Sequence, residues 1–422
     1  MDRVVELSIG ELFAGAGGLS LGFILAEHPQ VRFRPVFAID NDARALESYR
    51  YNMKWLSQNA PDVLPRIPGI FKRDVENLNV TALLRLSKLR RGELDLLIGG
   101  PPCQGFSTSN RRSKEKSKNN RNKLVNVFLD KLNGFLPKMF LIENVQGVRW
   151  TQPTPDMHVQ PAQESLFPDV NSGPVSVQEF LKQKAISLGY RVWHGVLDAV
   201  DFGVPQSRKR FFLVGVRADL VSDKEEISLN RYLKAMAEKI SVIRAIGDLP
   251  MLENGQSWEC NEYGPGDDAY VKKMRCFMKN GELHDHATTR HAHYVIERYR
   301  KIPEGGNWRD VRDDMSNYKK IENTHSNIYR RLVSSEPANT ISHYRKSMII
   351  HPSQHRGLSL REACRLQSFP DWCRFHGTIN DKQQQLANAV PPLMAAIVAK
   401  AIGDFWLSDV NYKTSTTIST ST

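Results

Sequence analysis

The chain has 422 residues, of which 41% are hydrophobic, so it is long enough to bury a sizeable core. It contains no apolar run of about 18 residues and no charged leader before a cleavage site, so we expect neither a membrane span nor export. Its formal net charge of +12, from 58 basic and 46 acidic side chains, favours a polyanionic partner.

The first 215 residues or so alternate short apolar strands with helical stretches. This alternation is typical of a doubly wound α/β fold with a mostly parallel sheet. Helical stretches are predicted at residues 19–27 and 43–52. The strands are expected to end near Leu12, Ile39, Ile98, Ile142 and Val216.

A glycine-rich turn, FAGAGG at residues 13–18, follows the first strand and opens a helix. Its glycines could admit a nucleotide against the backbone. The dinucleotide fingerprint would need a third glycine at position 20, where Ser20 stands. We therefore expect a nucleoside without a pyrophosphate, which disfavours a nicotinamide oxidoreductase.

Two further segments each carry an acidic residue, one directly after the second strand and one before the next helical segment. Asp40 and Asn41 come directly after the second strand, where a carboxylate can accept hydrogen bonds from ribose hydroxyls. Asp74 and Val75 precede the next helical segment, and Asp74 could accept a hydrogen bond from the exocyclic amine of a base. A helix N-cap accounts for Asp74 equally well, because aspartate is favoured at that position.

A rigid turn, GPPCQGFS at residues 100–107, follows the strand at residues 94–98 and presents Cys103. The two prolines fix the backbone, and the carboxyl end of a strand is where open α/β sheets place their chemistry. Taken alone, Cys103 is equally well a small buried hydrophobe. A neighbouring strand at residues 139–142 ends in Glu143, so a thiol and a carboxyl group share one edge, which favours a nucleophile.

The five cysteines (Cys103, Cys260, Cys276, Cys364 and Cys373) are odd in number and lack C-x-x-C spacing. This pattern argues against a disulfide framework and a zinc site, so we expect no bound metal and a reducing, cytoplasmic location. The basic segment at residues 111–123 is either a solvated loop or a phosphate-contacting lid.

The remaining chain is less regular. The proline-rich residues 150–176 are predicted to form a surface insertion, and residues 217–337 to form a second domain. Within it, residues 305–310 (GGNWRD) either approach a ligand or form a tight turn around a buried Trp308. Helical periodicity returns at residues 359–371 and 393–406, before a low-complexity tail expected to be disordered.

The motifs described above, taken in chain order, resemble those of the DNA (cytosine-5)-methyltransferases of prokaryotic restriction–modification systems. The resemblance extends from Leu7 to about Ile402, and rests on residues 13–18, 100–107, 143–145, 206–210 and 385–392. It implies a Rossmann-like methyltransferase fold with a smaller target-recognition domain. The implied division is a catalytic and cofactor-binding domain at 1–216, target recognition and hinge at 217–375, a return to the catalytic domain at 376–408, and a tail at 409–422.

The resemblance also implies S-adenosylmethionine as the methyl donor. Phe13 would stack near the adenine, Asp40 would bind the ribose, Asp74 the adenine amine, and Asn388 would close the pocket. The full expected cofactor set is Phe13, Ala14, Gly15, Gly17, Gly18, Asp40, Asn41, Asp74, Val75, Pro102, Asn388, Ala389 and Val390. Two residues depart from the family pattern: Asn41 replaces an apolar or aromatic residue, and Asn119 replaces an aspartate.

Cytosine C5 is a poor nucleophile until another nucleophile adds at C6, and we expect the Cys103 thiolate to add there. Arg208 and Arg210, on one face of a strand, would supply positive charge and orient the base. Glu143 would bind the ring N3 and the exocyclic amine. Because neither ring atom is accessible in a stacked duplex, the target nucleotide must flip out.

Double-stranded DNA is thus the expected partner of a monomeric enzyme, with a cognate restriction endonuclease acting on the same site. The residues expected to contact DNA are Gln104, Ser107, Arg111, Arg112, Arg121, Gln206, Gly305, Gly306 and Arg309. Two alternatives are an RNA cytosine methyltransferase with the same thiolate chemistry and a catalytically silent DNA-binding protein of the same fold.

Overall fold

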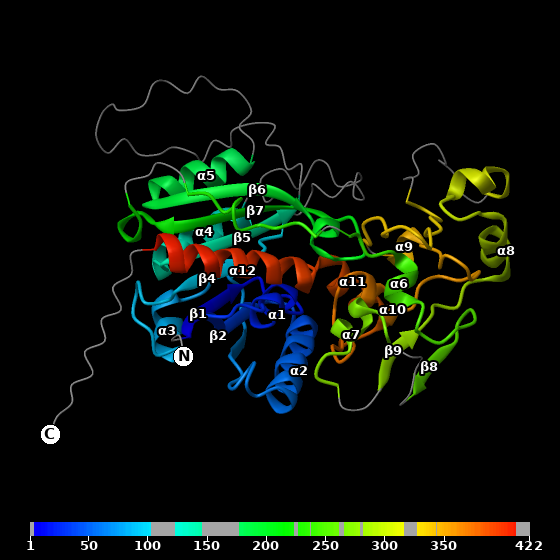
Figure 1. The fold of residues 1–422 in the computed structure, drawn as a ribbon, viewed down its shortest axis with the longest axis horizontal. Coiled ribbons are helices and arrows are strands. Elements are labelled where there is room, and N and C mark those ends of the chain that lie inside the picture. The colour runs from blue at the N-terminus through cyan, green and yellow to red at the C-terminus, as the bar shows by residue number, and fades with distance from the viewer. Residues whose placement is uncertain are drawn as a thin grey trace, which may run out of the picture.

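A computed structural model describes residues 4–102, 123–145, 177–222, 227–236, 238–260, 266–278, 282–315, 327–342 and 344–410 (Figure 1). Several predicted features lie outside these residues. They are Cys103 with the rest of its turn, the basic segment up to residue 122, the proline-rich segment, and the low-complexity tail.

A seven-stranded sheet in the order β3-β2-β1-β4-β5-β7-β6 forms the centre of the fold. The strands are β1 (Val5–Leu12), β2 (Val31–Asp40), β3 (Gly69–Lys72), β4 (Leu96–Gly99), β5 (Met139–Val145), β6 (Tyr190–Asp198) and β7 (Lys209–Arg217). Neighbours from β3 to β5 pair in parallel, whereas β7 is antiparallel to both β5 and β6. The expected α/β class is confirmed, and β3 and β6 are additional strands.

One edge of the sheet gathers the functional segments. The parallel strands β1, β2, β4 and β5 all end there, each followed by a segment that the sequence singled out. Because β7 runs the other way, its first residues reach the same edge, and Arg210 pairs with Val145 at the end of β5.

Helices cover both faces of the sheet (Figure 1). They are α1 (Gly18–Ile24), α2 (Ala43–Asn59), α3 (Val80–Leu86), α4 (Lys123–Phe135), α5 (Val177–Ser187) and α12 (Pro392–Asp409), with 3-10 turns η1 (Ala199–Phe202) and η2 (Ala218–Leu220). Side chains of α1 and α12, such as Phe23 and Ile402, pack on one face. Side chains of α3, α4 and α5, such as Leu83, Phe128 and Leu181, pack on the other.

The helix α12 returns the chain to the sheet and packs against α1. One 18-residue window within Ile379–Asp409 is long and apolar enough to cross a membrane by composition alone, contrary to the expectation of no such run. In the folded chain 67% of that window is buried. Its apolar residues, including Val398 and Phe405, cover the sheet, which explains their hydrophobicity.

The second half of the chain lies beside the sheet domain (Figure 1). Its elements are α6 (Val242–Ile246), β8 (Ser257–Cys260), α7 (Ala269–Met274), β9 (Leu283–Ala287), α8 (His293–Lys301), η3 (Trp308–Asp314), α9 (Tyr344–Ser347), α10 (Leu360–Leu366) and α11 (Ile379–Asn388). Strands β8 and β9 form a separate antiparallel pair. The helices predicted at 359–371 and 393–406 correspond to α10 and α12.

A shared hydrophobic core joins the second half to α2. Tyr49 and Leu56 of α2 belong to the same buried cluster as Trp372 and Phe375, and the rings of Trp55 and Trp372 stack with centroids 4.6 Å apart. The segment after α10 is thereby held against the sheet domain.

Close packing of α1 on α12 depends on Gly22. A Cβ at this position would stand 2.4 Å from both Ala395 Cβ and the Pro392 carbonyl oxygen. We expect G22A to lower the free energy of unfolding by about 1–3 kcal/mol through overpacking, as measured by urea denaturation. In the control G134A, the atoms nearest to the new Cβ belong to the Val80 side chain, the first at 3.2 Å. Equal stability of G22A and wild type would contradict this account.

Candidate active site

The glycine-rich turn after β1 has the backbone conformations that its sequence requires. Gly15 and Gly17 have φ of 53° and 88°, and Phe13 also adopts a positive φ of 58°. A Cβ at Gly17 would stand 2.6 Å from the Tyr49 ring, whereas a Cβ at Gly15 would meet no atom within 4 Å. The turn thus packs against the Tyr49 ring at Gly17, whereas the space beside Gly15 is open.

Asp40, at the end of β2, faces this turn. Its Oδ2 accepts a hydrogen bond from the Gly15 amide at 2.8 Å, and its Oδ1 accepts one from the Asp42 amide at 2.8 Å. Burial raises the pKa of Asp40, an effect that these amide donors partly offset. Asn41 is exposed, and Asp42 caps α2. The structure therefore brings the predicted ribose acid to the predicted nucleoside turn.

Asp74 lies on the surface after β3, and its neighbour Val75 is buried in the core under the sheet. The Asp74 carboxylate accepts a hydrogen bond from the Glu76 amide at 3.0 Å. The side chain that caps α3 is Asn79. The alternative of an N-cap for the following helix therefore does not apply to Asp74, which is free to face a ligand on its exposed side.

Glu11, which the sequence analysis missed, lies beneath the glycine turn and is 2% exposed. Its Oε2 is buried with no hydrogen-bond partner in the described part of the chain. Burial raises its pKa to about 8, with hydrogen bonds from Ser20 opposing the shift and the Asp40 charge adding to it. Its signal was an acidic residue inside a buried strand, directly before the turn.

Glu143 forms the centre of the second cluster. It is 8% exposed, and its Oε1 pairs with Arg210 Nε at 2.9 Å. A Cβ on Gly100 would stand 3.0 Å from Glu143 Oε2, so this carboxylate lies against the turn that leads to Cys103. Asn144 donates to the Pro101 carbonyl at 3.2 Å and fixes that turn to β5. Burial raises the pKa of Glu143, and the charges of Arg210 and Arg208 oppose this shift.

Arg208 differs from Arg210 in what it contacts. It is 1% exposed, and its terminal nitrogens donate to the carbonyl oxygens of Ile341, Ala387 and Ala389. Its charge opposes the rise in the pKa of Glu143. Three backbone carbonyls thus bind its terminal nitrogens, its buried Nε has no partner among the described residues, and orientation of a base by Arg208 stays a prediction.

Gln206 was expected to contact DNA, and its position corrects that prediction. The side chain is fully buried; its Oε1 accepts from the Ile341 amide at 2.9 Å and its Nε2 donates to the Leu366 carbonyl at 3.2 Å. Both ends of the amide thus bind the protein's own backbone.

Residues 388–390 lie at the end of α11, near the glycine turn. Asn388 is exposed and accepts a hydrogen bond from Gln384 at 2.9 Å, whereas Val390 is buried. A Cβ on Gly18 would stand 2.4 Å from the Val390 carbonyl oxygen and 3.3 Å from Ala389 Cβ. This segment therefore forms one side of the turn, while Pro102 lies exposed after β4.

In the second half, the two glycines form a tight turn beside a buried tryptophan. Gly305 has a φ of 73°, Asn307 caps η3, and Trp308 is 6% exposed. Arg309 is exposed and lies over the Trp308 ring, 5.5 Å from its centroid. The turn alternative is confirmed, and DNA contact by this turn stays a prediction.

The catalytic and DNA-contact candidates Cys103, Gln104, Ser107, Arg111, Arg112 and Arg121 lie outside the described residues. Within the described ranges, no group of histidine, cysteine and acidic side chains could hold a metal ion. Cys276, Cys364 and Cys373 are free thiols.

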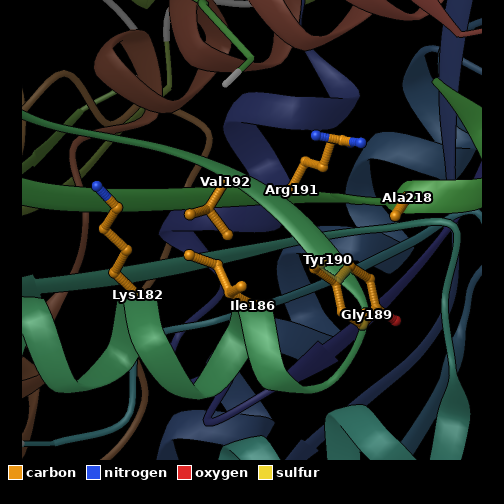
Figure 2. A pocket seen from close by; sticks show the side chains of 7 residues that line it. All are labelled: Lys182, Ile186, Gly189, Tyr190, Arg191, Val192 and Ala218. Atoms are coloured by element: carbon orange, nitrogen blue, oxygen red, sulfur yellow. The ribbon is translucent and has the colours of Figure 1, made fainter. Parts of the chain in front are cut away.

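A surface hollow lies between α5 and the edge strand β6 (Figure 2). Its lining residues are Lys182, Ile186, Gly189, Tyr190, Arg191, Val192 and Ala218. Tyr190 pairs with Arg217, at the end of β7 opposite to Arg210. The hollow is therefore remote from Glu143, and the candidate site is the edge where β1, β2 and β5 end.

Comparison with known proteins identifies relatives across the whole chain. The family model of C-5 cytosine-specific DNA methylases matches residues 7–404. Type II methyltransferase M.DdeI of Desulfomicrobium norvegicum is 30% identical over 421 residues, covering 96% of this chain and 90% of the relative. Type II methyltransferase M.XorII of Xanthomonas oryzae pv. oryzae is 31% identical over 420 residues, covering 93% and 83%.

Solved structures show the same architecture. A prophage-encoded E. coli protein, described as a DNA modification methyltransferase, superposes with a TM-score of 0.67 at 26% identity, covering 94% of this chain and 99% of that one. The S. pombe Dnmt2 methyltransferase superposes with a TM-score of 0.53 at 15% identity, covering 95% and 98%, a likeness of fold.

The raised pKa of Glu11 predicts a pH-dependent stability. Between pH 4.5 and about 8 the folded chain holds a proton that the unfolded chain has released, so stability falls as pH rises through this window. The variant E11Q has no titratable group at this position, so its stability does not fall with pH for this reason. We expect it to match wild type near pH 5 and to exceed its free energy of unfolding at pH 8 by about 3–4 kcal/mol, since each pH unit over which only the folded chain holds the proton is worth about 1.4 kcal/mol.

Urea unfolding at both pH values measures this difference. The control E6Q makes the same substitution on β1 at a side chain that is 59% exposed. Parallel pH profiles for E11Q and wild type would show that Glu11 is ionised in the folded chain.

Proposed function

The chain belongs to the C-5 cytosine-specific DNA methylase family and is a DNA (cytosine-5)-methyltransferase of restriction–modification type. We propose that it methylates a flipped-out cytosine within a specific duplex sequence. The observation that supports this reaction best is the buried Glu143–Arg210 pair, 2.9 Å apart, against the turn that leads to Cys103. The pair and the glycine turn meet at one edge of the sheet.

The family uses S-adenosylmethionine as methyl donor, and the residues present fit it. The open space at Gly15 lies beside the Asp40 carboxylate, as a ribose requires, and the buried unpartnered Oε2 of Glu11 can accept a hydrogen bond from a cationic group. The donor, when bound, supplies an electrophilic methyl group.

The other expected contacts complete the proposed pocket. Its apolar and backbone walls are Phe13, Ala14, Gly17, Gly18, Val75, Pro102, Ala389 and Val390, and its polar rim is Asn41, Asp74 and Asn388. Phe13 would stack near the adenine, and the exposed Asp74 carboxylate would accept a hydrogen bond from the adenine amine.

At the base, we propose that the Cys103 thiolate forms a bond to C6 while Glu143 supplies a hydrogen bond or proton to N3. The raised pKa of Glu143 favours its protonated form, and Arg210 fixes its orientation. The electron pair then at C5 would form the bond to the methyl group as the S–CH3 bond breaks with its electron pair staying on sulfur. Loss of the C5 proton to solvent re-forms the C5–C6 double bond, the S–C6 bond breaks to return the thiolate, and N3 returns its proton to Glu143, which yields 5-methylcytosine.

Duplex DNA is the proposed substrate. Residues 217–375 would read its sequence, with Gly305, Gly306 and Arg309 among the contacts, and the basic residues after Cys103 would hold phosphates. The catalytic domain would comprise 1–216 and the return at 376–408. We further propose a cytoplasmic monomer whose methylation protects DNA from a cognate endonuclease.

The variant C103A tests the covalent step. Without the thiolate no nucleophile adds at C6, so we expect methyl transfer to DNA to fall below detection while binding of S-adenosylhomocysteine, measured by calorimetry, is retained. Wild-type turnover in C103A would exclude the proposed mechanism.

The variant E143Q tests the proton at N3. Glutamine keeps the shape of the side chain but cannot deliver a proton or pair with Arg210, so we expect kcat to fall by at least about 100-fold. The control E93Q removes the exposed Arg90–Glu93 pair instead and should leave kcat unchanged. Similar rates for E143Q and wild type would rule out this role.

A further inference from the structure

Arg208 is a buried cation at the junction of three chain segments. Its Nη1 donates to the Ile341 carbonyl at 3.2 Å, and its Nη2 donates to the carbonyls of Ala387 at 2.6 Å and Ala389 at 3.1 Å. None of the ion pairs between described residues includes it. Among the described residues, carbonyl oxygens are the hydrogen-bond partners of this guanidinium and its Nε has none, so it is sensitive to where those carbonyls lie, because each lost contact leaves charge unsolvated.

On one side, Arg208 contacts the segment that lines the proposed cofactor pocket. Residues 387–390 comprise the last turn of α11 and the first residues after it, and the Val390 carbonyl is so close to Gly18 that a Cβ there would stand 2.4 Å away. A ligand that orders the glycine turn therefore also orders the carbonyls that bind Arg208.

On the other side, Arg208 directly precedes β7, the strand that carries Arg210. Its amide donates to Asp198 Oδ1 at 2.7 Å, which fixes the start of β7. Two residues later Arg210 pairs with Glu143, and the charges of both arginines act on the pKa of this carboxyl group.

We propose that Arg208 is a positioning residue that couples the cofactor pocket to the base site. Ordering of residues 387–390 fixes the guanidinium, and the guanidinium fixes the start of β7 and with it the Arg210–Glu143 pair. This inference rests on the proposed function. Because coupling between sites is reciprocal, bound DNA tightens the cofactor pocket by the same factor as the cofactor tightens DNA binding.

Gln367 provides a matched control. Its Nε2 donates to the Leu386 carbonyl at 2.7 Å and to the Ala389 carbonyl at 2.8 Å, so it holds the same segment as Arg208. It follows α10 and is remote in sequence from β7. Loss of Gln367 therefore removes two hydrogen bonds to this segment while the three contacts of Arg208 remain.

The experiment is calorimetric titration of the full chain with S-adenosylhomocysteine, alone and with a duplex containing the sequence at which methylation maps. We expect duplex to tighten binding in wild type at least about 5-fold. In R208K, which keeps the positive charge but lacks the planar guanidinium, the ratio of the dissociation constants of S-adenosylhomocysteine without and with duplex should fall to about 1. In Q367M, binding should weaken in both states while the ratio persists.

Two results would overturn the inference: a wild-type ratio in R208K, or an equal loss of the ratio in Q367M, which would indicate a merely structural role. Hydrogen exchange on wild type gives a second test that depends on no variant. S-adenosylhomocysteine should slow amide exchange at residues 206–212, and unchanged exchange there would contradict coupling. Failure of the chain to bind S-adenosylhomocysteine at all would instead contradict the proposed function.

Discussion

The reversal of one strand, β7, is the constraint on which the rest of the site depends. Because β7 runs antiparallel to β5, its first residues lie beside the last residues of β5, and Arg210 meets Glu143. Burial alone would disfavour the charged carboxylate, and the guanidinium opposes that effect. The result is an oriented carboxyl group with a raised pKa, next to the turn that leads to the proposed nucleophile. A fully parallel sheet would place an arginine at the start of this strand at the far end of the fold.

Buried ion pairs fix the internal geometry of the second half of the chain, which its shared core attaches to α2. Arg356 pairs with Glu362 by two hydrogen bonds of 2.9 and 2.6 Å, and Arg365 bridges Asp371 and Asp248. Buried pairs of this kind contribute little net stability over apolar packing, but losing one partner is costly, so they fix one geometry. The consequence is that residues 387–390, which follow these contacts along the chain, reach the glycine turn in a defined position.

The sequence was sufficient for the α/β class, for the strands β1, β2, β4, β5 and β7, and for the meeting of Asp40 with the glycine turn, because each rests on local apolar runs and strand ends. It was insufficient where partners come from distant segments. The spacing of Arg208 and Arg210 placed both on one face of a strand, but carbonyls more than 130 residues further along the chain determine what Arg208 binds. The burial of Gln206 depends on Ile341 and Leu366 in the same way. Strand β3 has only four residues, none of them buried, so its apolar signal was weak.

The most direct test of the account is transfer of a labelled methyl group from S-adenosylmethionine to duplex DNA of mixed sequence, with RNA as a parallel substrate and the modified bases mapped. The account predicts 5-methylcytosine at one position of a short recurrent duplex sequence, and no label in RNA. Label in RNA alone, or in neither substrate, would contradict the assignment of duplex DNA as the substrate while leaving the fold unchanged.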